Sequence, residues 1–245
     1  MKHFKDIILA CLAALLIWQL IVWATGVPPY ILPGPIRVWQ AFLFNFDLLL
    51  EHAQITILEV LLGLLIGGVL GVVSALHLMI SPLARRFMLP FLVFSQAVPV
   101  FALAPILTLW LGYGIASKIL MAVLIIYFPV TSNFYDGLRR TDRGLLDLGK
   151  TMGATERHIL WHLRLPSALP SLGSGLSLAA VYAPIGAVIG EWVGSSKGLG
   201  YLMLLANGRA KIDLMFAALI VLALFTVLLH YLVSRLSKRM TDWTG

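Results

Sequence analysis

The sequence predicts an all-α integral membrane protein, with six transmembrane helices in one domain that spans residues 1–245. Hydrophobic residues make up 60% of the chain, charged residues only 12%, and the mean hydropathy is +0.94. A soluble domain needs more polar residues to cover its surface. The apolar residues also gather in long uncharged runs, and no segment between these runs is large enough for a water-soluble core.

The first three predicted spans are residues 7–24, 55–80 and 87–111. The first run is longer than a usual signal-peptide core and lacks an A-x-A-like cleavage site, so a retained helix is favoured over a cleaved signal peptide. Four prolines in residues 26–35 predict an extended segment outside the membrane. Residues 36–50 should then form an amphipathic helix at the membrane surface.

Glycines in the second span predict a close contact with another helix, and prolines in the third span predict a break in the helix. The second span carries four glycines that share a face, Gly63, Gly67, Gly68 and Gly71. Another helix can approach closely there. The third span carries three prolines, Pro90, Pro99 and Pro105. Because proline frees backbone carbonyls, the third span is predicted to be a broken helix.

The remaining spans are predicted at residues 115–134, 172–193 and 214–233. Residues 194–213, which begin GSSKGLGYLM, should form a re-entrant or surface helix on the outer side. Between spans four and five lies the one long polar passage, residues 142–166, which the rest of the chain surrounds with apolar runs.

The polar passage, residues 142–166, predicts two short helices that meet at a glycine corner. An aspartate can cap the first helix, whose leucines recur at helical spacing, and Gly153 should end it. Thr155 can cap the second helix, and Pro166 and Pro170 are expected to close it. A solvated connecting loop is the plainer alternative.

Positive charge predicts the orientation of the spans. With both termini in the cytoplasm, the inner segments hold 13 of the 18 Lys and Arg residues. The outer segments hold the other five, Arg37, Lys118, Lys197, Arg209 and Lys211. By the positive-inside rule, the polar passage therefore faces the cytoplasm. The net charge of +7 comes from bases at span ends without interleaved aromatics, which argues against a nucleic-acid partner.

The chain lacks the motifs of an enzyme. No G-x-x-x-x-G-K-[ST] loop occurs, so nucleotide hydrolysis by that route is excluded and no cofactor is expected. His158 and His162 have the spacing of a zinc pair but no third ligand, and we expect them to be packing residues. No G-x-S-x-G motif occurs either, and no metal site is predicted.

Two carboxylates lie inside predicted spans, where an unpaired charge costs several kcal/mol. Glu59 lies one to two turns into the second span, and Glu191 lies at the outer end of the fifth. Either they reach headgroup water, or they line the outer mouth of a translocation path. The other candidates for such a path are Gln96, Pro99, Trp110 and Tyr182, which are more often packing or interhelical contacts in spans.

The polar passage resembles the "EAA" signature of the membrane subunits of ABC-type importers. The resemblance rests on Gly153, on Leu163 with Leu165-Pro166, and more loosely on Asp147-Leu148-Gly149, where the family has Glu-Ala-Ala. It implies that the passage is a coupling helix that sits in a groove of a separate ATPase. The residues implied in coupling are Asp147, Gly149, Gly153, Ala154, Thr155, Leu163, Leu165 and Pro166.

Residues 28–233 are also similar to the nitrate/sulfonate/taurine branch of binding-protein-dependent permeases. The strings VPPYILPGPIRVWQAF, QAVPVFALAPILTLWLGYG and GEWVGSSKGLGYLM carry this likeness. Within the branch, YAPIGAVIGEWVGSSKGLGYLMLLANGR looks most like permeases for pyrimidine precursors of thiamine. A sulfonate, taurine or nitrate remains an alternative substrate.

This resemblance implies the type I importer permease fold and a set of partners. They are a second copy of the chain, two cytoplasmic ATP-binding subunits that bind the ATP, an extracytoplasmic substrate-binding protein and the inner membrane. ATP-driven closure of the partners would pull the two coupling passages together and reorient the helices. Two other classes are a secondary transporter, which would need paired intramembrane charges, and a membrane-embedded enzyme, which would need a catalytic cluster.

Overall fold

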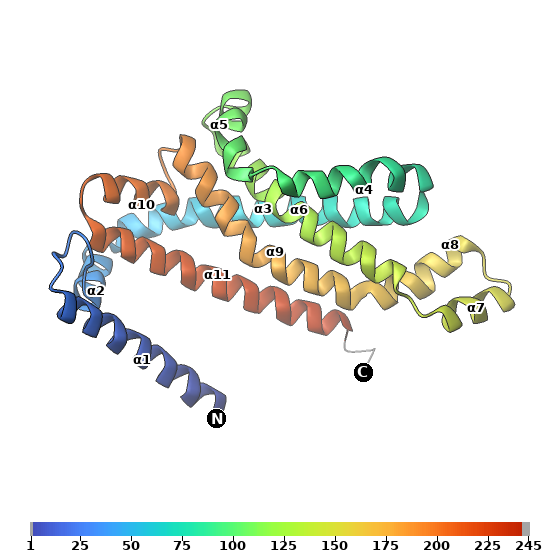
Figure 1. Cartoon of the computed structure of the whole chain (residues 1–245), viewed down its shortest axis with the longest axis horizontal. Coiled ribbons are helices and arrows are strands. Elements are labelled where there is room, and N and C mark those ends of the chain that lie inside the picture. The colour runs from blue at the N-terminus through green and yellow to red at the C-terminus, as the bar shows by residue number, and fades with distance from the viewer. Residues whose placement is uncertain (1, 242–245) are drawn as a thin grey trace.

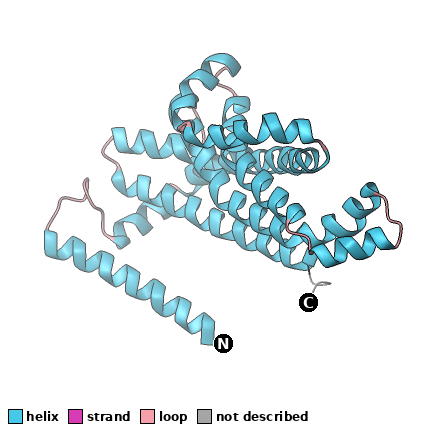
Figure 2. Cartoon of the chain, turned by 45° about the vertical axis from the view of Figure 1, so that its right-hand side comes forward, coloured by secondary structure: helices cyan, strands magenta, loops and turns pink. Residues whose placement is uncertain are grey.

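The computed structural model describes residues 2–241, and every regular element in this range is a helix (Figures 1 and 2). Four long helices run side by side and form the body of the molecule. They are α3 (Phe46–Ile80), α6 (Ile115–Arg139), α9 (Leu165–Gly194) and α11 (Ile212–Thr241). The predicted all-α class is confirmed.

These four helices are long and apolar enough to cross a membrane. The span that contains α9 also includes the helical residues before it and runs from Glu156 to Gly194. A fifth span is reached if α4 (Pro82–Ala97) and α5 (Val100–Leu111) count as one broken helix. The first helix, α1 (Lys2–Thr25), contributes a shorter apolar stretch, Leu9–Thr25, in the part that the structure describes. The structure thus supports four or five of the six predicted spans by this measure.

The third predicted span is broken, as its prolines indicate. α4 and α5 meet at Val98 and Pro99 with a bend of 102°, and α5 stands away from the body (Figure 1). Pro90 and Pro105, in contrast, lie inside α4 and α5. Only one of the three prolines therefore ends a helix.

The second span begins earlier than predicted, and the expected surface helix at residues 36–50 is wrong in its extent. The surface helix is α2 (Pro35–Phe44), and α3 already starts at Phe46. Asn45 separates them, and its Nδ2 donates to Ala41 O at 2.8 Å. Ala41 O also accepts from the Asn45 backbone N–H at 3.1 Å, so Asn45 ends α2 with two hydrogen bonds to one carbonyl.

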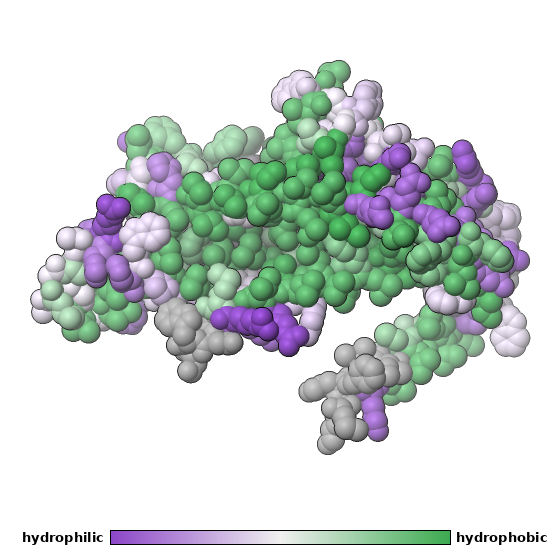
Figure 3. All heavy atoms as spheres, turned by 180° about the vertical axis from the view of Figure 1, so that it is seen from behind, coloured by the Kyte–Doolittle hydropathy of each residue, from purple (hydrophilic) through white to green (hydrophobic). Residues whose placement is uncertain are grey.

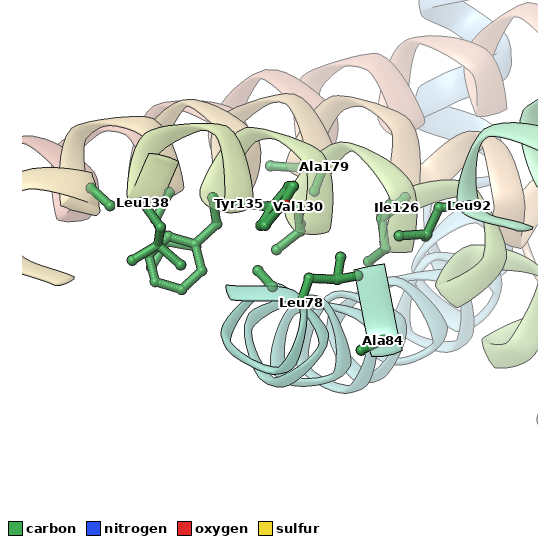
Figure 4. Packing of buried hydrophobic residues seen from close by; sticks show 14 of the residues in the cluster. Leu78, Ala84, Leu92, Ile126, Val130, Tyr135, Leu138 and Ala179 are labelled. Carbon is green, nitrogen blue, oxygen red and sulfur yellow. The ribbon is translucent and has the colours of Figure 1, made fainter. Parts of the chain in front are cut away.

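The core lies where α3, α6 and α9 meet, and the side chains of Leu78, Ile126, Val130 and Ala179 pack there (Figure 4). The expected close approach to the second span is confirmed for three of its four glycines. A Cβ on Gly63, Gly67 or Gly71 would come within 2.6–2.7 Å of a side chain of α6, whereas one on Gly68 would make ordinary contact with Leu176. Small residues thus allow two spans to pack closely.

The two short helices of the polar passage are present as α7 (Arg143–Thr151) and α8 (Glu156–Ile159). The prediction that Pro166 and Pro170 close the second helix is wrong, because α8 continues through one π-helical turn, η1 (Leu160–Arg164), into α9. The Leu165 N–H bonds back to Leu160 O, five residues earlier. The wider turn puts Pro166 in the first turn of α9, where a missing N–H is tolerated.

Short helices lie at the two ends of the molecule. Helices α7 and α8 lie at the same end as the C-terminal end of α11, and α2 and α10 (Leu199–Gly208) lie at the opposite end (Figure 1). Hydrophobic side chains cover the middle of the face in Figure 3, and hydrophilic ones are concentrated toward the ends. This distribution fits a chain whose long axis crosses the membrane.

Candidate functional site

Helix α7 projects from one end of the body and exposes apolar side chains. Its N-cap is the predicted aspartate, Asp142, whose Oδ1 accepts from the Leu145 N–H at 3.0 Å. Leu145, Leu148 and Met152 are 38%, 57% and 78% exposed. Exposed apolar side chains on a polar, projecting helix form a surface suited to a protein partner.

Gly153 makes the corner between α7 and α8, as the sequence predicts. Its φ is +82°, in the left-handed region, and its N–H donates to Lys150 O at 2.9 Å. The Ala154 N–H donates to Gly149 O at 3.0 Å, so the last turn of α7 is closed by the corner itself. Thr155 then caps α8, with its Oγ1 accepting from the His158 N–H at 3.3 Å.

The corner is held against the rest of the chain through Gly149. A Cβ on this buried glycine would lie 2.9 Å from Leu163 Cδ1, so α7 packs closely on η1 at this point. Leu165 and Pro166 are half-buried at the start of α9, whereas Asp147 is exposed on α7. The structure thus brings the eight predicted coupling residues into one projecting unit, residues 142–166, which we call the coupling passage.

A second polar group lies inside the body at the opposite end. Glu59 of α3, Lys118 of α6 and Glu191 of α9 are 2%, 1% and 1% exposed. The Glu59 carboxyl lies against that of Glu191, and both face the Lys118 ammonium. We call these three residues, with Thr56 and His52, the buried cluster.

Glu191 provides the N-terminal cap of α10. The N-cap position of α10 is Gly198, which has no side chain to accept the free N–H groups. Glu191 Oε2 accepts from the Gly200 N–H at 2.5 Å and from the Tyr201 N–H at 3.3 Å. A carboxylate at a helix N-terminus is stabilised by the helix dipole. The Glu191 carboxylate therefore stabilises the start of α10 inside the body.

Thr56 and His52 connect α3 to the same turn. Thr56 Oγ1 donates to Glu191 Oε1 at 2.6 Å and accepts from the Leu199 N–H at 2.8 Å. His52 Nδ1 accepts from the Gly198 N–H at 3.0 Å. Gly198 has φ +108°, and a Cβ on it would overlap the Glu191 carboxyl. Glycine at this position therefore lets the carboxylate approach the turn.

Lys118 ties α6 to the end of α9. Its Nζ donates to Gly194 O, the last residue of α9, at 2.5 Å and to Tyr113 O at 2.8 Å. A cation at a helix C-terminus is favourable. The charge count assigns Lys118 to the outer segments, and the structure shows that its side chain is buried in the body, in the first turn of α6.

The structure separates the predicted path residues into two sets. Glu59 and Glu191 are buried within the subunit, whereas the other four are exposed. These are Gln96 on α4, Pro99 at the break, Trp110 on α5 and Tyr182 on α9. Within one subunit, the two glutamates therefore do not face the surface on which the others lie.

A family model described as "Binding-protein-dependent transport system inner membrane component" matches residues 67–242. The chain belongs to this family. It is an importer permease subunit of ABC type, a multi-pass protein of the inner membrane that works with an ATPase and a binding protein. The permease has no ATPase site or cofactor of its own, and the partner subunit binds ATP.

Known proteins similar to the permease support this assignment. It is 52% identical over 225 residues to a "Probable ABC transporter permease protein" of Haemophilus influenzae, with 92% of each chain covered. It is 37% identical over 233 residues to the "Formylaminopyrimidine transport permease protein ThiX" of Halalkalibacterium halodurans, covering 95% of this chain and 93% of the other. A solved inward-facing MetNI methionine ABC transporter matches its fold with a TM-score of 0.69 at 20% identity, over 80% of this chain and 98% of the other.

Sequence reasoning missed three members of the buried cluster in the permease, Lys118, Thr56 and His52. A signal was present for Lys118, since it lies within the apolar fourth span while two unpaired acids lie in the second and fifth. Charges of opposite sign in separate spans are expected to pair. Thr56 gives no such signal, because threonine is common in spans and its partner is 135 residues away.

Proposed function

We propose that the permease passes a small solute through the membrane with six spans, α1 included, and with both termini in the cytoplasm. The coupling passage would then face the cytoplasm and bind the ATPase. The observation that carries this proposal is the projecting helix α7, since its Leu148 and the Met152 that follows it are exposed, and α7 lies at the end where α11 terminates. The basic residues of the sequence favour the same end for the cytoplasm.

Support for a coupling role comes from the continuity of α8 with α9, which are joined through η1 without an intervening loop. Arg164 adds a second connection, since its Nη1 donates to Leu138 O of α6 at 2.9 Å. A force that the ATPase applies at the corner would therefore reach both α6 and α9. This is the direct physical route by which closure of the ATPase would reorient the path.

A second copy of the permease would cover α5 and complete the path. This helix stands off the body, and its Phe101, Leu109 and Trp110 are largely exposed (Figure 1). Gln96 and Tyr182 are polar or amphipathic side chains exposed on neighbouring apolar helices. We place the path between the two copies along these residues, with Pro99 at the helix break.

Replacing Gly153 with arginine tests the coupling assignment. The variant is expected to insert normally, because nothing lies within 4 Å of a Cβ at this position. A side chain at φ +82° strains the corner by about 1–2 kcal/mol and adds bulk where the ATPase would dock. We expect co-purification of the ATPase and uptake to be lost.

The wild-type assembly should have the native mass of two permeases with two ATPase subunits.

Gly208→Arg is the matched control for that experiment. Gly208 ends α10 at the opposite end of the molecule, and a Cβ there also meets nothing within 4 Å. This variant should retain the ATPase. If Gly153→Arg keeps the ATPase and uptake as fully as Gly208→Arg does, the coupling passage does not dock the ATPase.

For the substrate we propose a pyrimidine precursor of thiamine. The support is the relative with 37% identity whose name specifies formylaminopyrimidine transport. The alternatives are a sulfonate, taurine or nitrate. Calorimetric titration of the cognate binding protein with each compound should show tight binding only for the pyrimidine. Tight binding of one of the others, with none of the pyrimidine, would reassign the substrate.

A further inference from the structure

A cavity of about 640 Å³ lies beside the coupling passage, where the end of α3 and the start of α4 face α8 and η1. One part of its wall is apolar and is made of Met79, Ile80, Leu160 and Trp161. Ile80, the last residue of α3, and Trp161 are about half exposed or more. The cavity therefore has an open hydrophobic side next to a span end.

The other part of the wall is cationic. Arg85 of α4, Arg157 of α8 and Arg164 of η1 contribute three guanidinium groups, and Glu156 contributes one carboxylate. The lining thus carries a formal charge of +2, three positive charges less one negative. Glu156 lies 3.9 Å from the Lys150 ammonium, which offsets its charge locally.

The three arginines have no protein counter-ion in the described part of the chain, since no carboxylate there lies within 4 Å of them. Arg164 is nevertheless held in place by its bond to Leu138 O. A guanidinium carries five N–H donors, so this single bond leaves others for a ligand. Three unneutralised guanidinium groups around one cavity are suited to an oxyanion, above all a phosphate.

The level of the cavity indicates where such a phosphate would come from. α3 is apolar up to Ile80, and the basic residues Arg85 and Arg86 follow at the start of α4, so we place the turn between them near one surface of the hydrocarbon layer. Lipid phosphates lie at this depth, directly beside the acyl chains. A cavity with an arginine rim and an apolar wall therefore matches an amphiphilic anion better than a free ion.

We propose that this cavity binds one anionic phospholipid of the adjacent leaflet. Arg85 and Arg157 hold its phosphate, with Arg164 beside them, and the first part of the acyl chains packs on Met79, Ile80 and Trp161. The bound lipid would bridge the α3–α4 turn and the coupling passage, which belong to different parts of the fold. Neither the family assignment nor the proposed solute path requires this site.

The test is native mass spectrometry of the purified full-length protein with phosphatidylglycerol or phosphatidylcholine that carry the same acyl chains. The double variant Arg85→Gln/Arg157→Gln is expected to bind phosphatidylglycerol about thirtyfold more weakly, which corresponds to about 2 kcal/mol for the two arginines together. Both residues are exposed, so the variant should fold normally. Its thermal unfolding midpoint, compared with that of the wild type, checks this.

Arg140→Gln/Arg143→Gln is the matched control, since these two arginines are also exposed at this end but do not line the cavity. It should retain the lipid. Excess inorganic phosphate should not displace the lipid from the wild type. Equal loss of lipid in both double variants, equal binding of phosphatidylcholine, or displacement by inorganic phosphate alone would each overturn the proposal.

Discussion

The Gly186→Ala variant is expected to lower the apparent midpoint of thermal unfolding by roughly 10 °C, which corresponds to about 3 kcal/mol for a chain of this size. An added Cβ would lie 2.6 Å from Ala122 Cα, 2.9 Å from Ala122 N and 3.0 Å from Met121 O. All three are backbone atoms of α6, so the steric overlap can be removed only by a shift of the whole helix. α6 and α9 form the most extensive helix pair of the described chain, and the shift would disturb its packing.

The measurement is tryptophan fluorescence or size-exclusion retention of the heated protein in detergent. Gly208→Ala is the control, because it adds the same methyl group where nothing lies within 4 Å. That control should unfold at the wild-type temperature or slightly above it, since alanine favours helix. If both variants unfold together, the close contact at Gly186 does not limit stability.

Glu191→Ala is expected to destabilise the protein by about 4 kcal/mol, because it removes one partner of a buried charged group. The Thr56 hydroxyl and the N–H groups of Gly200 and Tyr201 would lose their acceptor in a buried site. Each such group costs about 1–3 kcal/mol when left unsatisfied. The start of α10 should loosen first, so hydrogen exchange of the peptide amides at residues 199–202 should accelerate.

Glu51→Ala is the control for Glu191→Ala, because it also removes a carboxylate near α10 but not a buried one. Glu51 also joins α3 to the turn before α10, through a 2.9 Å ion pair with Lys197, but this pair is exposed to solvent. Exposed ion pairs contribute little to stability. Amide exchange in Glu51→Ala should match the wild type. An equally small effect of Glu191→Ala would mean that the buried carboxylate does not hold α10 in place.

The sequence was most informative where structure depends on neighbours along the chain. The corner of the coupling passage was predictable residue by residue, because an N-cap side chain and a left-handed glycine act over three or four positions. The rule that proline ends a helix failed at Pro166 for an equally local reason. The π-helical turn before it has no signature in the residue types, so the continuous path from α8 into α9 could not be foreseen.

The sequence indicated that some residues make contacts between spans, but it did not indicate which helix is the partner. The glycines of α3 indicated a close helix contact, and the structure identifies α6 as the partner. The isolated charges of Glu59 and Glu191 indicated that these residues were unusual, but hydropathy alone does not show which helix supplies a counter-charge. Lys118 near the start of a span reads equally well as a surface lysine. Its burial depends on how α6 and α9 cross.

The uninterrupted helical segment from Glu156 to Gly194 makes the two ends of the molecule mechanically interdependent. Its main part, α9, has 30 residues and spans about 45 Å, and the chain changes direction between α8 and α9, at η1 (Figure 1). One end belongs to the cytosol-facing corner in our proposal, and the other carries Glu191, which caps α10. Tilting this lever by a few degrees would displace its far tip by several ångströms, so an event at one membrane surface could open or close the opposite one.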